Sequence, residues 1–449
     1  MKGIKRILTK ALTTALLVTA AVFAGGSMKA EAASYFNAYD KASYEKTSTD
    51  FSLKVDGKSV DVVDYYEGTY SYAHIAYEGT ASFEVTAKNG NISSYELSPH
   101  SYNMKATRSG NKLSFSLKQD GSRYIILELK AGGKSDMLVI AADPKETYTK
   151  PAVDGKTVVD ITKSPYSADK TGNKDVSSIL QKAIDDMSKK GGGTVYVPAG
   201  VYKFVYIDAR DNVTLYLDEG AFLRGSGNRN DYQWDDSGEN GRQGRRNIDL
   251  KDSKNFQIVG RGVIDANSTV LVEKGSNGKA DGYDNFRKGI IDGYGAKNFV
   301  LDGVTVKDAT GWTFSIQLAE NVKCRNVKML NHPNFVHSDG YDFLSCKGVE
   351  VLDCFGITGD DIFCPKASIV DAEMKDYLYK NCVGFGLNGA GCKVGMQARG
   401  NTTNIEFNDI DIIGCHRGIS ISHDDGNGDF SDIRFIKVRS QRLDKGNTS

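Results

Sequence analysis

Three aspartates stand close together in the segment HSDGYDFLSCKGVEVLDCFGITGDDIFCPKAS, which runs from His337 to Ser368. Asp339 precedes the adjacent pair Asp360 and Asp361 by 21 residues. Clustered carboxyl groups repel one another, so at least one of them has a raised pKa. This difference suits glycoside hydrolysis, in which a protonated acid donates to the leaving oxygen while an ionised partner activates water. Asp-Gly and Gly-Asp-Asp are also common turn sequences, which is the alternative interpretation of each acid taken singly.

The surrounding sequence is an array of repeats. Short strand-like segments begin with Asn, Asp or Gly at Asn212, Asn255, Asn298, Asn321, Gly348, Asp376, Asn404 and Asp432. From the third segment onward the steps are 23, 27, 28, 28 and 28 residues. A repeat of this length without helices predicts a right-handed parallel β-helix in which each repeat is one coil. A leucine-rich horseshoe has a similar period but requires a leucine consensus, which is absent.

The predicted coils bring the three acids together. Residues one coil apart lie about 4.8 Å apart across a parallel ladder. Asp339 is separated from Asp360 and Asp361 by slightly less than one coil. We therefore expect all three to share one face of the β-helix at neighbouring levels.

A second, smaller unit precedes the repeats. Residues 34–145 alternate apolar and polar side chains over short runs that end in Gly, Asn or Asp, as in a β-sandwich. Residues 146–157 are predicted to be a linker, and residues 158–449 the β-helix domain with its catalytic acids. The predicted fold is therefore all-β, a β-sandwich followed by a parallel β-helix.

One helix is expected, at the amino-terminal end of the β-helix. In DVSSILQKAIDDMSKKGGG the apolar residues follow a helical period, with Asp175 as the predicted N-cap and Gly191 as the stop. The stripe consists of Val176, Ile179, Leu180, Ala183, Ile184 and Met187. We expect this helix to cap the first coil.

The first residues have the pattern of a secretory signal peptide, with basic residues, a short apolar run and the small-residue site Ala30-Glu31-Ala32. The run is too short for a membrane-spanning helix, so we expect cleavage near residue 33, secretion to the extracellular space and no membrane attachment of the mature chain. Removing residues 1–33 leaves 52 basic and 56 acidic side chains, a formal balance of −4. This mild acidity gives no electrostatic basis for binding nucleic acid. We expect a monomer.

All seven cysteines lie between Cys324 and Cys415, and none forms a Cys-x-x-Cys motif. A zinc site is therefore not expected. We interpret most of them as buried small apolar residues rather than disulfides, with Cys354, Cys382 and Cys415 stacked in an internal ladder.

The acidic segment resembles the active-site stretch of glycoside hydrolase family 28, the polygalacturonase family. Ser338-Asp339-Gly340, Gly359-Asp360-Asp361 and Lys366 match its motifs, and similarity to the family extends over about residues 158–438. The resemblance implies a polysaccharide substrate, with Asp360 as general acid and with Asp339 and Asp361 holding the hydrolytic water. It also implies inversion at the anomeric carbon. We expect no cofactor and no metal. The sandwich resembles, more loosely, an accessory domain of related enzymes.

Two motifs depart from the family. Gly389-Ala390-Gly391 stands where the family has Gly-His-Gly, and Ser420-Ile421-Ser422 stands where it has Arg-Ile-Lys, which grips a galacturonate carboxylate. His337 replaces the family's first Asn. Candidate substrate-binding residues are His337, Tyr341, Lys366, Lys393, Arg399, His416, Arg417 and His423.

These departures leave several functions open. Retained acids with an altered cation pair favour a hydrolase of plant cell-wall pectin that uses other cations. The alternatives are a hydrolase of a neutral α-glucan, resembling the dextranase family, a polysaccharide-binding protein without activity, and a calcium-dependent lyase. The chain ends at Ser449 directly after a strand-like segment, so we expect a fragment or a partner over the last coil.

Overall fold

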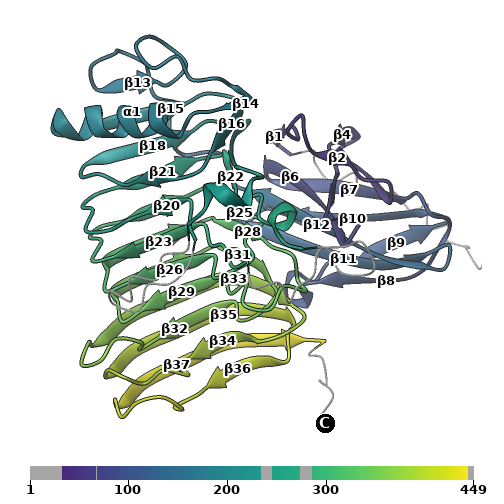
Figure 1. The fold of residues 1–449 in the computed structure, drawn as a ribbon. Helices are drawn as coiled ribbons and strands as arrows, with labels where there is room; N and C mark the ends of the chain where they lie inside the picture. The colour runs from purple at the N-terminus through teal and green to yellow at the C-terminus, as the bar shows by residue number, and fades with distance from the viewer. Residues whose placement is uncertain (1–32, 67, 234–244, 274–285, 443–449) are drawn as a thin grey trace, which may run out of the picture.

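The computed structural model describes residues 33–66, 68–233, 245–273 and 286–442, so all of the predicted leader except its last residue, Ala33, lies outside the described residues. Figure 1 shows a long column of stacked coils with a smaller sandwich of strands packed against its side. The predicted fold class is confirmed. Of the helices in the described ranges, none is both long and apolar enough to cross a bilayer.

The sandwich consists of two sheets, and among its described strands only the pair β6 and β12 is parallel. The first sheet contains β1 (Tyr35–Ala38), β2 (Lys46–Thr47), β5 (Val63–Tyr65), β6 (Tyr70–Glu78), β8 (Ile92–Ser98), β11 (Arg123–Ala131) and β12 (Lys134–Asp143). The second contains β3 (Phe51–Val55), β4 (Lys58–Val60), β7 (Thr80–Ala87), β9 (Ala106–Ser109) and β10 (Lys112–Lys118). Strict alternation of buried and exposed residues, as in β3 and β10, places one side of each strand in the core between the sheets. A 3₁₀ turn, η1 (His100–Tyr102), follows β8.

The column is a parallel β-helix. One continuous sheet covers two of its faces and contains β13 (Val158–Asp160), β14 (Thr171–Asp175), β15 (Gly193–Val197), β16 (Gly200–Phe204), β18 (Val213–Leu217), β19 (Ala221–Gly225), β21 (Gln257–Gly260), β22 (Val263–Asp265), β24 (Val300–Asp302), β25 (Thr305–Lys307), β27 (Glu320–Arg325), β28 (Lys328–Leu330), β30 (Lys347–Leu352), β31 (Phe355–Thr358), β33 (Met374–Gly386), β35 (Thr402–Gly414) and β37 (Phe430–Gln441). The third face is a separate sheet of β17 (Ile207–Asp208), β20 (Ile248–Asp249), β23 (Ile291–Tyr294), β26 (Phe314–Gln317), β29 (Tyr341–Leu344), β32 (Phe363–Lys366), β34 (Ala390–Val394) and β36 (Arg417–Ile421). Two 3₁₀ turns, η2 (Arg229–Asp231) and η4 (Thr269–Leu271), lie in connections that lead to the third face.

The residues that open the sequence repeats form a ladder at one corner of the β-helix. All eight of them have positive φ, a conformation that Asn, Asp and Gly adopt at low cost. The side-chain amides of Asn255, Asn298 and Asn321 each donate to the asparagine one coil before, over 2.7–3.0 Å. The repeat is therefore visible in the sequence because each coil needs a left-handed residue at the same corner.

The predicted helix is α1 (Ser177–Lys189), which lies across the first coils at the top of Figure 1. Leu180, Ala183, Ile184 and Met187 are buried, as the stripe predicts. The predicted N-cap is wrong by one residue, because Val176 occupies the cap position and Asp175 is the last residue of β14. Asp175 instead accepts a hydrogen bond from the amide of Ser177 over 2.7 Å.

The interior of the coils is a continuous apolar core. Aromatic rings stack from coil to coil, with centroids 4.7 Å apart for Tyr379 and Phe407 and 5.1 Å apart for Phe407 and Phe435. All seven cysteines are free and buried, as we expected for most of them. The expected ladder of three is partly wrong, because Cys415 follows the end of β35 at a different corner, where its amide bonds to the carbonyl of Gly386.

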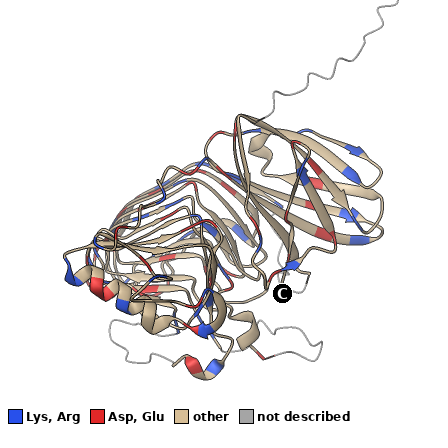
Figure 2. Ribbon diagram, turned by 90° about the horizontal axis from the view of Figure 1, so that it is seen from above, with Lys and Arg blue, Asp and Glu red and all other residues tan. Residues whose placement is uncertain are grey.

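The sandwich packs on the face formed by β28, β31 and the later parts of β33 and β35. This apolar interface consists of Tyr65, Tyr70, Tyr72, Tyr124, Ile126 and Val139 from the sandwich and Leu330, Phe355, Ile357, Val383, Phe385 and Ile413 from the coils. Buried ion pairs lie within the same contact, such as Lys328 with Asp143 at 2.9 Å. Figure 2, seen from above, shows the sandwich against one side of the coils.

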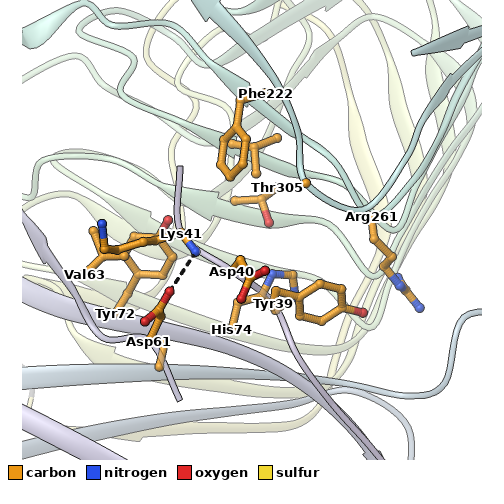
Figure 3. Close-up of a pocket in the computed structure, with 13 residues that line it drawn as sticks. Tyr39, Asp40, Lys41, Asp61, Val63, Tyr72, His74, Phe222, Arg261 and Thr305 are labelled. Carbon is orange, nitrogen blue, oxygen red and sulfur yellow. Dashed lines mark hydrogen bonds between the residues drawn. The ribbon is translucent and has the colours of Figure 1, made fainter. Parts of the chain in front are cut away.

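A small cavity of about 30 Å³ lies at this contact, with room for one water molecule. Figure 3 shows Tyr39 and His74 from the sandwich facing Phe222, Arg261 and Thr305 from the coils. The sandwich and the coils thus share a buried apolar and ionic interface.

Candidate active site

The three acids lie at the edge of the third face where the chain enters β29 and β32. Asp339 and Asp361 each stand two residues before their strand, in consecutive coils. The amide of Gly340 donates to the carbonyl of Asp361 over 2.9 Å, so the two backbones pair directly. The structure thus brings together the acids that the sequence spacing placed on one face.

Asp339 is 4% exposed and belongs to a buried triad with Lys366 and Asp342. The ammonium group of Lys366 lies 2.9 Å from a carboxylate oxygen of each acid, and Trp312 covers it with its ring centroid at 3.8 Å. Burial is the main cause that raises the pKa of Asp339, to about 6, and that raises the pKa of Asp342 far above its usual range. Burial opposes the charge of Lys366, but the two carboxylates outweigh it and raise the pKa of the ammonium. One buried cation cannot neutralise two anions, so we expect the triad to hold a proton at neutral pH.

Asp361 is 5% exposed, and both of its carboxyl oxygens accept hydrogen bonds. The amide of Ala390 donates to one of its oxygens over 2.8 Å, and the ammonium of Lys393 donates to the other over 2.6 Å. Burial disfavours the ammonium of Lys393, but Cys364 and Asp361 outweigh this and raise its pKa. These contacts stabilise negative charge on Asp361.

Asp360 differs from its neighbours because it is partly exposed and, in the described part of the chain, makes no ion pair. Among the described residues, its carboxylate accepts the amides of His337, over 3.3 Å, and of Asp361, over 3.1 Å. Burial and then the charge of Asp361 raise the pKa of Asp360. Asp360 is therefore the member of the trio best placed to hold a proton toward solvent.

Gly389 packs directly against this acid. It has φ +61°, and a Cβ atom there would lie 2.6 Å from the backbone carbon of Asp360 and 2.8 Å from its Oδ1. The substitution Gly389→Ala is therefore expected to displace Asp360, with at least a tenfold loss of kcat and a cost of about 2 kcal/mol in stability. Steady-state kinetics and urea unfolding measure the two effects. Gly133→Ala, at φ +85° with nothing within 4 Å, is the matched control for strain alone, and equal kcat in both variants contradicts the prediction.

The raised pKa of Asp339 predicts how stability changes with pH. A carboxyl group that binds its proton more tightly in the folded chain stabilises the fold at low pH. That contribution is lost as pH rises from about 4 to about 6. The Asp339→Asn variant lacks this group and should not show that loss. Its free energy of unfolding relative to the parent should therefore be about 2 kcal/mol higher at pH 7 than at pH 4. Urea unfolding of both proteins at the two pH values is the measurement, and parallel pH dependences would contradict it.

Two of the predicted substrate-binding residues are wrong. Tyr341 is 0% exposed, and its hydroxyl donates to the carbonyls of Val327 and Phe355 inside the coils. It faces inward because it is the first residue of β29, where alternation points its side chain into the core. Lys366 is 3% exposed and is fully engaged by Asp339 and Asp342, so it supports the acids and does not reach substrate.

Arg399 and His423 lie away from the acids. They follow β34 and β36, so in a parallel sheet they stand at the opposite edge from Asp339 and Asp361. Arg399 pairs with Asp425 at 2.6 Å, and His423 Nε2 lies 2.8 Å from the carbonyl oxygen of Gly428.

Arg417 is better placed. It pairs in register with Ala390. The carbonyl of Ala390 accepts the amide of Ile362, so Ala390 lies one coil after Asp361 in the same ladder. Arg417 therefore stands two coils after Asp361 at the same edge of the sheet. Arg417 and His416 are exposed, and among the described residues neither side chain has an ion-pair partner. They remain candidates for binding substrate.

His337 lies directly beside the acids, and Arg287 near it was missed by the sequence analysis. His337 has φ +69°, a conformation that His, like Asn, adopts more readily than most residues. Burial and then the positive charge of Arg287 lower the pKa of the His337 ring. Arg287 is exposed, and no ion-pair partner for it occurs in the described ranges. The one feature of the sequence that could have indicated Arg287 is its position four residues before the strand β23.

The strand register shows which residue lies nearest in the ladder to one of the two missing family motifs. Lys393 pairs with Ser420, so this lysine stands one coil before the position of the family's arginine. Its ammonium is occupied by Asp361 and is not free for a substrate carboxylate. Among the described residues, no group of three or more Asp, Glu, His or Cys side chains is arranged to hold a metal ion.

The family model described as Glycosyl hydrolases family 28 matches residues 198–446. The chain belongs to this family. A relative described as a "Probable polygalacturonase" from Vitis vinifera is 22% identical over 286 residues, which cover 59% of this chain and 56% of the relative. The chain thus spans about half the length of that relative.

Three solved structures share the architecture of this family 28 chain. The family 28 exopolygalacturonase of Yersinia enterocolitica is 16% identical, with 93% of this chain and 88% of that chain covered and a TM-score of 0.51. The polygalacturonase from Erwinia carotovora is 18% identical, with coverage of 67% and 80% and a TM-score of 0.53. Dex49A from Penicillium minioluteum is 13% identical, with coverage of 90% and 83% and a TM-score of 0.54. At these identities the likeness establishes the fold alone.

Proposed function

We propose that this protein is a glycoside hydrolase that cleaves pectin-type polysaccharide of the plant cell wall with inversion. Family membership supports the reaction class. The observation that carries the proposal is the unequal charge environment of the three acids. Asp339 and Asp361 each contact a lysine ammonium, whereas Asp360 is partly exposed, without an ion pair in the described chain, and has a raised pKa.

In this mechanism Asp360 donates its proton to the glycosidic oxygen as the bond to the anomeric carbon breaks. Asp361, together with Asp339, accepts a proton from the attacking water on the opposite side of the sugar ring. The ammonium groups of Lys393 and Lys366 stabilise the negative charge of these two acids during the reaction. The predicted product is the inverted anomer, which proton NMR of the first turnover products measures.

Free cations near the acids favour an acidic polymer. Arg287 and Arg417 are exposed, and neither has an ion-pair partner among the described residues. A guanidinium group binds a carboxylate in two parallel hydrogen bonds, which suits the acid group of a galacturonate unit. These two arginines would take over the role of the family's missing Arg-Ile-Lys.

A hydrolase of a neutral α-glucan is the second candidate. It is favoured by Ser420 and Ser422, which stand where the family has cations, and by the engagement of Lys393 with Asp361. The deciding experiment is an assay for new reducing ends on polygalacturonate, methylated pectin, rhamnogalacturonan, dextran and pullulan. Cleavage of dextran or pullulan alone overturns the pectin assignment. Retention on a polymer without cleavage indicates a binding protein.

A calcium-dependent lyase gives a different result in the same assay. Elimination produces an unsaturated sugar that absorbs in the near ultraviolet, and a chelator would stop it. We expect reducing ends without new absorbance and no effect of chelator, because lysine ammonium groups occupy the positions beside Asp339 and Asp361.

We also propose secretion and a monomeric state. The leader pattern of residues 1–33 supports secretion, and sequencing the amino terminus of the exported protein tests it. Size-exclusion chromatography with light scattering tests the monomer.

A further inference from the structure

The β-sandwich contacts the loop that leads into Asp339, and not only the outer face of the coils. The sandwich hairpin, defined here as residues 65, 66 and 68–70, joins β5 to β6. The hydroxyls of Tyr65 and Tyr66 donate to the carbonyl of Leu330 over 3.2 and 3.1 Å, and the hydroxyl of Tyr70 donates to the carbonyl of Asn331 over 3.2 Å. These carbonyls lie where β28 ends and the loop of residues 331–338 begins.

The hairpin also contacts a side chain within that loop. Thr69 Oγ1 lies 3.3 Å from Nε2 of His332, and the rings of Tyr66 and His332 pack with centroids 5.1 Å apart. The ring of His332 in turn packs edge-on against Phe335 at 5.1 Å. The contact therefore extends from the sandwich to the middle of the loop.

From Phe335 the same loop connects to both acidic segments. The carbonyl of Phe335 accepts the hydroxyl of Ser338 over 2.8 Å, and that hydroxyl accepts the amide of Gly359 over 2.9 Å. Ser338 directly precedes Asp339, and Gly359 directly precedes Asp360. A Cβ atom on Gly359 would lie 2.0 Å from the carbonyl oxygen of Phe335. The loop at Phe335 and the turn at Gly359 therefore pack so closely that no side chain fits between them.

The backbone of the hairpin carries strain at the residue that makes these contacts. Tyr66 has φ +49°, a conformation that Gly, Asn and Asp tolerate but that is costly for a residue with a large side chain. Such a conformation persists only where surrounding contacts hold it. Here it directs the hydroxyl of Tyr66 to Leu330 and its ring to His332.

We propose that the sandwich hairpin is a positioning element of the active site, which holds loop 331–338 so that Asp339 and Asp360 keep their mutual geometry. This inference rests on the proposed hydrolase function for its kinetic consequence. A sandwich that only anchored the coils would need the apolar contact with β31, β33 and β35 and no contact with this loop. Because small displacements of a catalytic acid have large effects on rate, removing the hairpin contacts should lower kcat more than it affects substrate binding.

The test compares two double variants that each delete two hydroxyls at the sandwich contact. Tyr66→Phe/Thr69→Val removes the hydroxyls that lie 3.1 Å from the carbonyl of Leu330, at the start of the loop, and 3.3 Å from Nε2 of His332 within it. Ser122→Ala/Tyr124→Phe removes hydroxyls that lie 2.8 and 2.9 Å from the side-chain amide of Asn326, away from the loop. We expect kcat to fall about tenfold with an unchanged KM in the first variant, and to change less than twofold in the second.

Hydrogen exchange makes the result independent of activity. The amides of residues 332–340 should exchange about tenfold faster in Tyr66→Phe/Thr69→Val than in the parent, and at the parent's rate in Ser122→Ala/Tyr124→Phe. Equal exchange in the two variants overturns the inference, as does a kcat loss shared equally by both. If the parent cleaves no polymer, the proposed function fails while the exchange result still decides the role of the hairpin.

Discussion

Replacing Asp360 by asparagine is expected to lower kcat on the cleaved polymer by about a thousandfold, with the fold intact. Asparagine keeps the shape of the side chain and, with its single oxygen, can accept one of the two amides of His337 and Asp361, but it holds no acidic proton. The leaving oxygen would then depart unprotonated, which is the slow step in water. Steady-state assay of reducing ends measures the effect.

The pH dependence separates this role from a general loss of structure. In the parent, kcat should fall as pH rises through the raised pKa of Asp360, because the acid must be protonated to act. The Asp360→Asn variant should lack this alkaline limb, and an aryl glycoside with a good leaving group should recover part of its rate. A variant that hydrolyses as fast as the parent would show that another group donates the proton.

Asp376→Asn provides the matched control for the loss of one aspartate. Asp376 is exposed and accepts the side-chain amide of Asn404 over 2.6 Å, in the corner ladder where other coils have asparagine. Asparagine can accept the same hydrogen bond and tolerates the positive φ of 61°. We expect kcat and stability to match the parent within error.

The β-helix and the grouping of its acids could be predicted because both depend on local, repeated signals. Each coil needs a left-handed residue at one corner, so Asn298, Asn321 and Asn404 recur at the period of the fold. The same period places Asp339 beside Asp361. In a solenoid, residues one repeat apart in the sequence lie next to each other in space, so the spacing of the acids predicts their proximity. Most other folds have no such regular relation.

The partners of the acids could not be predicted, because they depend on which way side chains turn at strand ends. Lys366 and Lys393 were considered as substrate contacts, yet each pairs with an acid. Tyr341 is buried because its strand starts one residue after the turn at Gly340, and no pattern marks that start. The contact of Tyr66 with Leu330 joins residues 264 positions apart, which no repeat encodes.

The largest expected loss of stability follows the substitution Lys366→Met. The ammonium of Lys366 is the cation that lies 2.9 Å from both Asp339 and Asp342, which are 4% and 0% exposed. Methionine fills a similar volume, but it leaves two buried carboxyl groups without their counter-charge. Breaking a buried pair in this way costs about 3–5 kcal/mol, and here the acid that is still ionised would have to take up a proton. Urea unfolding at pH 7 measures the loss, which should shrink at pH 4.

The triple variant Lys366→Met/Asp339→Asn/Asp342→Asn distinguishes lost charge balance from lost packing. With all three charges removed, most of the stability should return, because no uncompensated ion remains in the interior. Lys347→Met is the matched control, since Lys347 pairs with Glu373 at 3.3 Å on the surface and is worth less than about 1 kcal/mol. If the triple variant is as unstable as Lys366→Met alone, the ammonium acts through its packing under Trp312 and not through the two acids.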